Sequence, residues 1–95
     1  MVRHIVLWRL KSPEGTDFAR IREALAGQVG RIPGLLRVEV ARSFASGRRA
    51  VDFALLCDFE SREALAAYHR HPAHQETRAV VDPLIAEHWI ADYEL

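Results

Sequence analysis

The sequence has a single cysteine, Cys57, and no excess of charge of either sign. A lone cysteine cannot form an internal disulfide, so a reducing compartment, the cytoplasm, is expected. Thirteen basic residues balance thirteen acidic ones. The chain therefore lacks the excess of basic residues that is typical of a nucleic-acid-binding protein. The same balance gives no reason to expect binding to an anionic membrane.

Long apolar runs, glycine-rich phosphate loops and low-complexity segments are also absent. No stretch approaches the roughly 20 apolar residues that a membrane-spanning helix needs. Arg3, His4 and Arg9 interrupt the apolar run at the amino terminus, which is untypical of a signal peptide. Without a glycine-rich loop, nucleotide binding is not expected either.

What is present is the composition of a folded domain. The 95 residues are 49% hydrophobic and 27% charged. A chain of this length buries about 60–65% of its unfolded surface, which is enough for one core. We therefore expect a single domain over residues 1–95.

Apolar residues recur with strand and helix periods in successive segments. Alternation predicts four strands, over residues 2–10, 36–44, 50–59 and 88–93. Helical spacing predicts helices that begin at the N-caps Thr16 and Ser61, with a further helical turn or two through residues 80–85. The order β-α-β-β-α-β predicts an α+β, ferredoxin-like fold, a four-stranded antiparallel sheet with both helical segments on one face.

The predicted strands carry large apolar side chains on both faces, among them Trp8, Phe53 and Phe59. Helices cover only one face, and the other would exceed the few hundred Å² of apolar patch that monomers usually expose. A second copy packed sheet to sheet would bury it and form a dimeric α/β barrel, filled or holding one small ligand. By alternation along the first strand, we expect His4, Val6 and Trp8 to face the barrel.

Five stretches, in order along the chain, resemble one known family. They are Met1-Val2-Arg3-His4-Ile5-Val6-Leu7-Trp8, Ile32-Pro33-Gly34, Asp58-Phe59-Glu60-Ser61, Tyr68 with His71-Pro72-Ala73-His74, and Ala91-Asp92-Tyr93-Glu94. Together they are similar to the stress-responsive A/B barrel domain family, often called Dabb, of the dimeric α/β-barrel superfamily. The resemblance covers essentially the whole chain and implies a homodimeric barrel.

The resemblance also implies roles for two residues. One plant member is a polyketide cyclase that closes a linear poly-β-ketone by an intramolecular aldol condensation, without a cofactor. Its tyrosine before the histidine-proline motif and the second histidine of that motif match Tyr68 and His74 here. Phe53 stands where that enzyme has a cavity-facing histidine, so we expect a differently shaped pocket. The predicted ligand-binding residues are His4, Val6, Trp8, Phe53 and His71.

The chemistry of these side chains suits such a reaction. An imidazole with a pKa near ~6.5 can remove a proton next to a carbonyl. A phenol can hydrogen-bond the developing enolate. The alternative is structural, with Tyr68 a packed aromatic and His74 a capping or loop histidine.

A metal site is not expected. The candidates are His69, His71, His74 and His88. They lack the i, i+4 pair with an intervening glutamate of zinc hydrolases, and no cysteine cluster accompanies them. Cys57 lies in an apolar strand and is interpreted as a buried, inert thiol.

Three functions follow from these observations. The first is a cofactor-free enzyme that acts on a small apolar carbonyl or aromatic compound, with His74 as base and Tyr68 positioning the carbonyl. The second is a non-catalytic ligand-binding or stress-related protein. The third is a cofactor-independent monooxygenase or a haem-degrading enzyme, as in the wider superfamily, although bulky inward-facing groups leave little room for haem.

Overall fold

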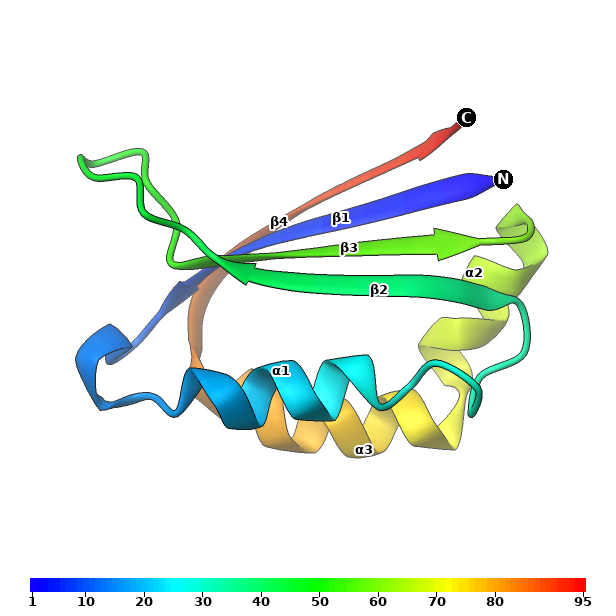
Figure 1. The fold of residues 1–95 in the computed structure, drawn as a ribbon, viewed down its shortest axis with the longest axis horizontal. Helices are drawn as coiled ribbons and strands as arrows, with labels where there is room; N and C mark the ends of the chain where they lie inside the picture. Colours follow the sequence, from blue (N-terminus) through cyan, green and yellow to red (C-terminus); the bar gives the residue numbers. More distant parts are fainter.

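The computed structural model describes residues 1–95 and contains one four-stranded antiparallel sheet (Figure 1). Its strands are β1 (Val2–Leu10), β2 (Leu35–Arg42), β3 (Phe53–Phe59) and β4 (Ile85–Glu94), in the spatial order β2-β3-β1-β4. The helices are α1 (Phe18–Ala26), α2 (Arg62–Arg70) and α3 (Pro72–Val81), with the short 3-10 helices η1 (Pro13–Gly15) and η2 (Asp82–Leu84). This topology confirms the ferredoxin-like prediction.

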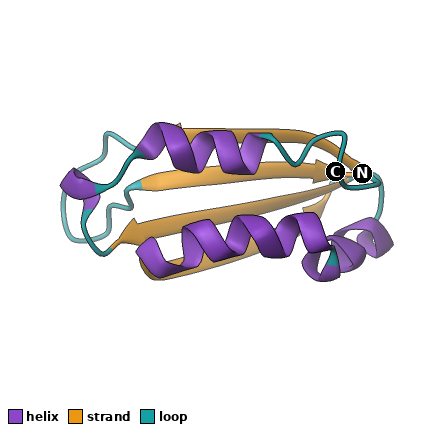
Figure 2. Ribbon diagram, turned by 90° about the horizontal axis from the view of Figure 1, so that it is seen from below, coloured by secondary structure: helices purple, strands orange, loops and turns teal.

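All three helices lie on one face of the sheet, as the view from below makes plain (Figure 2). We call this the covered face, and the opposite one the open face. None of the helices has both the length and the apolar character that crossing a membrane requires.

The helix starts follow from local capping. Asp17 rather than the predicted Thr16 caps α1, because the Asp17 side chain accepts a hydrogen bond from the backbone N–H of Arg20. The Thr16 hydroxyl instead donates to the Ser12 carbonyl. Ser61 caps α2 as predicted, accepting from the Ala64 N–H.

The last third of the chain is more regular than the sequence suggested. Pro72 does not end helical structure but occupies the first turn of α3, where its missing N–H costs nothing. The helix therefore runs ten residues, and β4 begins at Ile85 rather than at His88. The β2–β3 hairpin is shorter than predicted, because residues 43–52 form a projecting loop (Figure 1).

The core lies between the covered face and the helices. Trp8 and Phe53, neighbours across β1 and β3, pack with ring centroids 4.5 Å apart, and Phe59 is fully buried. The expectation that His4, Val6 and Trp8 face the barrel is therefore wrong, because all three are buried on the covered face. Alternation identifies which residues share a face, but not which face the helices will cover.

The open face carries the other alternation set. Ile5 and Leu7 of β1 pair with Leu56 and Ala54 of β3, and Leu7 also pairs with Trp89 of β4. Leu7 and Trp89 are 37% and 44% exposed. The open face thus has an apolar patch in the central part of β1 and β3, which suits a surface that packs against another.

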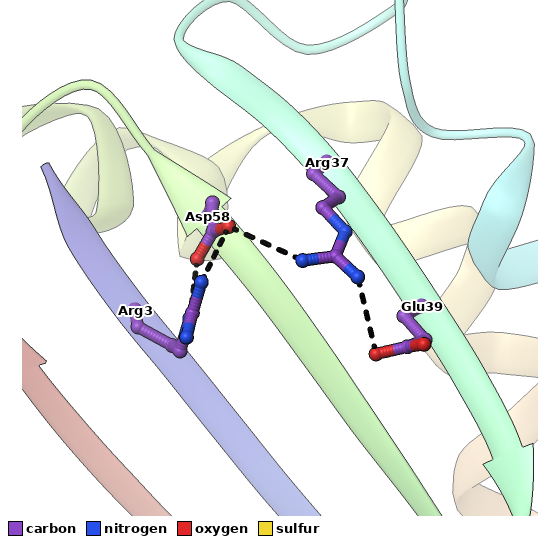
Figure 3. Close-up of polar contacts among 4 residues, drawn as sticks. All are labelled: Arg3, Arg37, Glu39 and Asp58. Atoms are coloured by element: carbon purple, nitrogen blue, oxygen red, sulfur yellow. Dashed lines mark hydrogen bonds and ion pairs between the residues drawn. The ribbon is translucent and has the colours of Figure 1, made fainter.

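Charged residues form a network on the same face (Figure 3). The Arg3 guanidinium donates two hydrogen bonds to Asp58, at 2.8 and 3.1 Å, from β1 to β3. Arg37 of β2 lies 4.0 Å from Asp58 and donates to Glu39 at 3.4 Å. The hydrogen bond from Arg3 holds the pKa of Asp58 below its usual value, although burial acts the other way.

Candidate functional site

A cavity of about 460 Å³ lies between the covered face and the helices. Its lining comes from both layers of the fold, from β1, β3 and β4 of the sheet and from the helices. The lining residues are His4, Val6, Trp8, Leu25, Leu55, Tyr68, His69, His74, Thr77, Arg78, Val81, Asp82, Ile85, Ala86, His88 and Ile90. The cavity is thus beneath the helices, and not on the open face where a barrel interior was expected.

The break between α2 and α3 brings Tyr68 and His74 together. Six residues apart on one continuous helix, they would point in different directions. Here α2 ends at Arg70, His71 adopts an extended conformation, and α3 restarts at Pro72. As a result, the two rings have centroids 3.9 Å apart, tilted by 38°.

Tyr68 is almost fully buried and lines the cavity beside His4 and Phe59. Burial raises the pKa of its phenol above the usual value of 10.0. The hydroxyl therefore stays protonated at neutral pH, so it is available as a hydrogen-bond donor.

The pKa of His74 is shifted in the opposite direction from that of Tyr68. Burial, with smaller contributions from His69, Arg78 and His4, lowers the pKa of His74 to about 4. The ring is neutral at pH 7, with one nitrogen protonated and the other carrying a lone pair. Its Nδ1 lies 3.2 Å from Oε1 of Gln28, which is itself fully buried.

His4 is held by a carboxylate. Its buried ring hydrogen-bonds through Nδ1 to Asp92, its register partner on β4. Its ring centroid is 6.2 Å from that of Tyr68 and 5.7 Å from that of His69. Because Asp92 accepts at Nδ1, Nε2 is the nitrogen left for a ligand. The pKa of His69 is also lowered, first by burial and then by His4.

The structure brings most of the predicted site residues to one cavity. Tyr68, His74, His4, Val6 and Trp8 all line it. Two predicted ligand-binding residues do not.

Phe53 lies behind the wall of the cavity and packs on Trp8 and Phe18 in the core. His71 caps α3, because its Nδ1 accepts a hydrogen bond from the Ala73 N–H. It stands directly before Pro72, the first residue of α3, and is therefore the N-cap of that helix.

Sequence reasoning missed Gln28 and the role of Asp92. Gln28 follows Gly27 at the end of α1, where a glutamine usually lies in solvent. Asp92 lies on β4, and only the register of β1 against β4 places it opposite His4. Gln28 carries no local signal, and Asp92 was noticed only as part of the stretch Ala91-Asp92-Tyr93-Glu94, with no role assigned to it.

Metal and thiol chemistry find little support in the geometry. No group of three or more histidine, cysteine, aspartate or glutamate side chains is arranged to hold a metal ion. Cys57 is fully buried, and burial raises the pKa of its thiol to about 12, so the thiolate is scarcely populated at neutral pH.

Solved structures share this fold. The chain is similar to an Arabidopsis thaliana protein (TM-score 0.86, 22% identity, covering 100% of this chain and 95% of that chain). It is also similar to a dimeric ferredoxin-like protein of Thermobifida fusca (TM-score 0.82, 24% identity, 99% and 90% covered). A third similar structure is a hydroxynitrile lyase of Passiflora edulis (TM-score 0.76, 21% identity, 99% and 92% covered).

Sequence comparison gives the family. The chain is 36% identical to an uncharacterised protein of Streptomyces coelicolor, over 99% of each chain. The family model described as Stress responsive A/B Barrel Domain matches residues 2–95. The resemblance found in the sequence is therefore confirmed, and the chain belongs to the stress responsive A/B barrel domain family.

Proposed function

We propose that this protein is a cofactor-free enzyme that closes a small poly-β-carbonyl compound by an intramolecular aldol reaction in the cavity beneath its helices. The observation that carries the proposal is the stacked pair of Tyr68 and His74 in the wall of a mainly apolar cavity. A phenol donor next to a neutral imidazole supplies the acid and the base that such a reaction needs.

In the proposed reaction, Nε2 of His74 takes a proton from a carbon between two carbonyl groups. The electron pair left on that carbon spreads onto a carbonyl oxygen, which accepts a hydrogen bond from the Tyr68 hydroxyl. The carbon then attacks a more distant carbonyl of the same molecule, not one of the two that flank it, and the new C–C bond closes the ring. The resulting alkoxide takes the proton back from His74, so the first product is an isomer of the substrate.

The shifted pKa values favour an acidic carbon as the proton source. A histidine with a pKa of about 4 is neutral at pH 7 but a weak base. A C–H flanked by two carbonyls is far more acidic than one beside a single carbonyl, so it suits this base. This match supports a 1,3-dicarbonyl unit in the substrate.

The other lining residues suit the parts of the substrate outside the 1,3-dicarbonyl unit. Val6, Trp8 and Leu55 offer apolar contacts, and Nε2 of His4 offers a polar one. We infer that the apolar residues bind a hydrocarbon or aromatic part while His4 orients an oxygen. The Passiflora edulis structure, named a lyase, is a similar fold associated with an enzyme.

We also propose that two protomers pack through their open faces. Ile5, Leu7, Leu56 and Trp89 would be buried by this contact, and the similar Thermobifida fusca protein is described as dimeric. The hydrophobic effect at about 25 cal/mol per Å² favours covering such a patch. In this arrangement the two cavities lie on the outer sides of the dimer, each under its own helices.

A pair of tyrosine variants tests the catalytic proposal. The probe is a synthetic linear β-triketone that ends in an ester, because its C–H between the ester and the first ketone can reach the last ketone and close a six-membered ring. With this triketone, Tyr68→Phe should lower kcat about 10²-fold, because one donor to the developing oxyanion is lost while the ring still packs. Tyr93→Phe is the matched control, since Tyr93 is exposed on β4 away from the cavity. His74→Ala should lower kcat about 10²- to 10⁴-fold.

Unchanged turnover in Tyr68→Phe and His74→Ala would exclude this pair as the acid and base. A protein that is thermally stabilised by the triketone but releases no product would instead support the non-catalytic binding alternative. Ligand binding stabilises the folded state by RT ln(1 + [L]/Kd), so a melting experiment measures it directly.

A further inference from the structure

Gln28 is a polar side chain in an unusual place. It is fully buried, directly after the end of α1, and neither of its neighbours in sequence is buried with it. A primary amide in an apolar interior costs free energy unless its groups are hydrogen-bonded. Both ends of the Gln28 amide have a partner, and one of these partners is His74.

The two contacts fix the orientation of the amide. Nε2 of Gln28 donates to the backbone carbonyl of Leu25 at 3.1 Å. A carbonyl only accepts, so the NH₂ group has to face Leu25. The amide oxygen is then left facing Nδ1 of His74, at 3.2 Å.

This orientation determines which nitrogen of His74 carries the proton. An amide oxygen accepts but does not donate, so Nδ1 of His74 must be the donor. The imidazole is neutral at pH 7 and has a single ring N–H. That N–H is therefore at Nδ1, where it donates to Gln28. Nε2 has no hydrogen-bond partner within the protein and keeps its lone pair.

We propose that Gln28 is a positioning residue that holds His74 as the Nδ1–H tautomer and so presents Nε2 as the proton acceptor in the cavity. The inference rests on the proposed function for its chemical purpose, but the tautomer itself is a property of the free protein. The Tyr68 ring packs against one side of the imidazole, and the hydrogen bond to Gln28 favours this ring orientation over the one flipped about the Cβ–Cγ bond.

The experiment is nitrogen-15 NMR of protein labelled at the histidine side chains, at pH 7 and without substrate. His74 should show a pyrrole-type Nδ1 resonance and a pyridine-type Nε2 resonance, assigned by their loss in His74→Ala. A pyrrole-type Nε2 in the wild-type protein would overturn the proposal without any Gln28 variant.

Two Gln28 variants separate positioning from packing. Gln28→Leu keeps a side chain that fills the buried space but removes the oxygen that accepts from Nδ1. The His74 resonances should therefore move to values averaged between the two tautomers. Gln28→Glu keeps an oxygen opposite Nδ1, and the Nδ1–H tautomer should be retained. Persistence of that tautomer in folded Gln28→Leu would also contradict the proposal.

Gln75→Leu is the matched control. Gln75 likewise donates to a backbone carbonyl, that of His69, but its side chain is exposed and forms no hydrogen bond with the His74 ring. Its His74 resonances should equal those of the wild-type protein. If the wild-type tautomer is as proposed but no triketone is turned over, the proposed function fails while the role of Gln28 stands.

Discussion

The imidazole of His74 is stacked on a buried phenol and lies near Arg78 and two other histidines. Burial disfavours the charged form most, and His69, Arg78 and His4 add to this effect, while Asp82 acts against it. The ring is thus ready to accept a proton from a ligand, yet it is hardly protonated by solvent at neutral pH. The charge state that chemistry needs is set by the packing around the residue.

The first prediction concerns the acid side of the pH profile. Because the pKa of His74 is lowered to about 4, kcat/KM should stay constant from pH 7 down to about pH 5 and fall near pH 4. An NMR titration of His74 should give the same midpoint. Arg78→Met removes a nearby positive charge and should raise that midpoint; a wild-type midpoint near ~6.5, the value of an unperturbed histidine, would contradict the prediction.

Asp58 supplies a second prediction at the residue scale. Its carboxylate is buried and accepts two hydrogen bonds from Arg3. Asp58→Asn should lower the free energy of unfolding by roughly 1.5–3 kcal/mol, the range for hydrogen bonds to charged groups. Glu39→Gln, at the exposed end of the same network, should change it by less than about 0.5 kcal/mol.

The pH dependence of this difference has a defined sign. The pKa of Asp58 is lower in the folded protein than in the unfolded chain, so its contribution is complete above the unfolded value of about 3.9. It is lost as the pH falls through the lower, folded value. Urea unfolding should therefore show wild type and Asp58→Asn converging below about pH 4; a gap that widens there would rule out this account.

At the scale of the elements, the segment that connects α1 to β2 packs closely against the start of α2. Gly34 has a φ of +81°, and a Cβ at this position would lie 2.6 Å from the Cβ of Ala64 in α2. The Gly34 carbonyl also accepts a hydrogen bond from the Glu60 N–H at 2.9 Å. Only glycine allows this approach of the two segments.

Gly34→Ala should therefore be costly for two reasons. The left-handed backbone costs about 1–3 kcal/mol for a residue with a Cβ, and the steric overlap adds about 1–3 kcal/mol. Gly47→Ala, at φ +107° with open space around it, isolates the backbone cost alone. Denaturant unfolding should show a larger loss in the free energy of unfolding for Gly34→Ala than for Gly47→Ala. Equal losses would mean that Ala64 moves aside without a free-energy cost.

The elements themselves were largely predictable. Alternation located β1 in full, and the Ser61 cap located the start of α2. The length of α3 was missed, because Pro72 both ends one helix and begins the next, and sequence alone does not say which. Asp17 caps α1 in place of the predicted Thr16, because the Thr16 hydroxyl donates its hydrogen bond to the Ser12 carbonyl.

The whole molecule has two different sheet surfaces. The helices lie against the covered face (Figure 2), which holds the core and the cavity. The open face carries Leu7, Trp89 and the charged network that Figure 3 shows. A charge placed in the middle of a buried dimer contact would be left without water or a partner. This reasoning gives a prediction for the assembly.

If the proposed dimer forms, the wild-type protein should sediment as a dimer in analytical ultracentrifugation and Leu7→Glu as a monomer. Phe44→Glu is the control, because Phe44 is fully exposed on the projecting loop and lies outside the sheet. It should leave the sedimentation coefficient unchanged. A wild-type protein that sediments as a monomer at micromolar concentration would contradict dimerisation through the open face.

The sequence by itself predicted the number and order of the strands, most of the helical segments, the family, and Tyr68 and His74 as candidate site residues, because periodicity, caps and short motifs are local in the chain. Which sheet face the helices cover, and hence where the cavity lies, was decided only by tertiary packing. The same holds for the partners of the site histidines. Gln28 is 46 residues from His74 and Asp92 is 88 residues from His4, and nothing local in the chain relates positions so far apart.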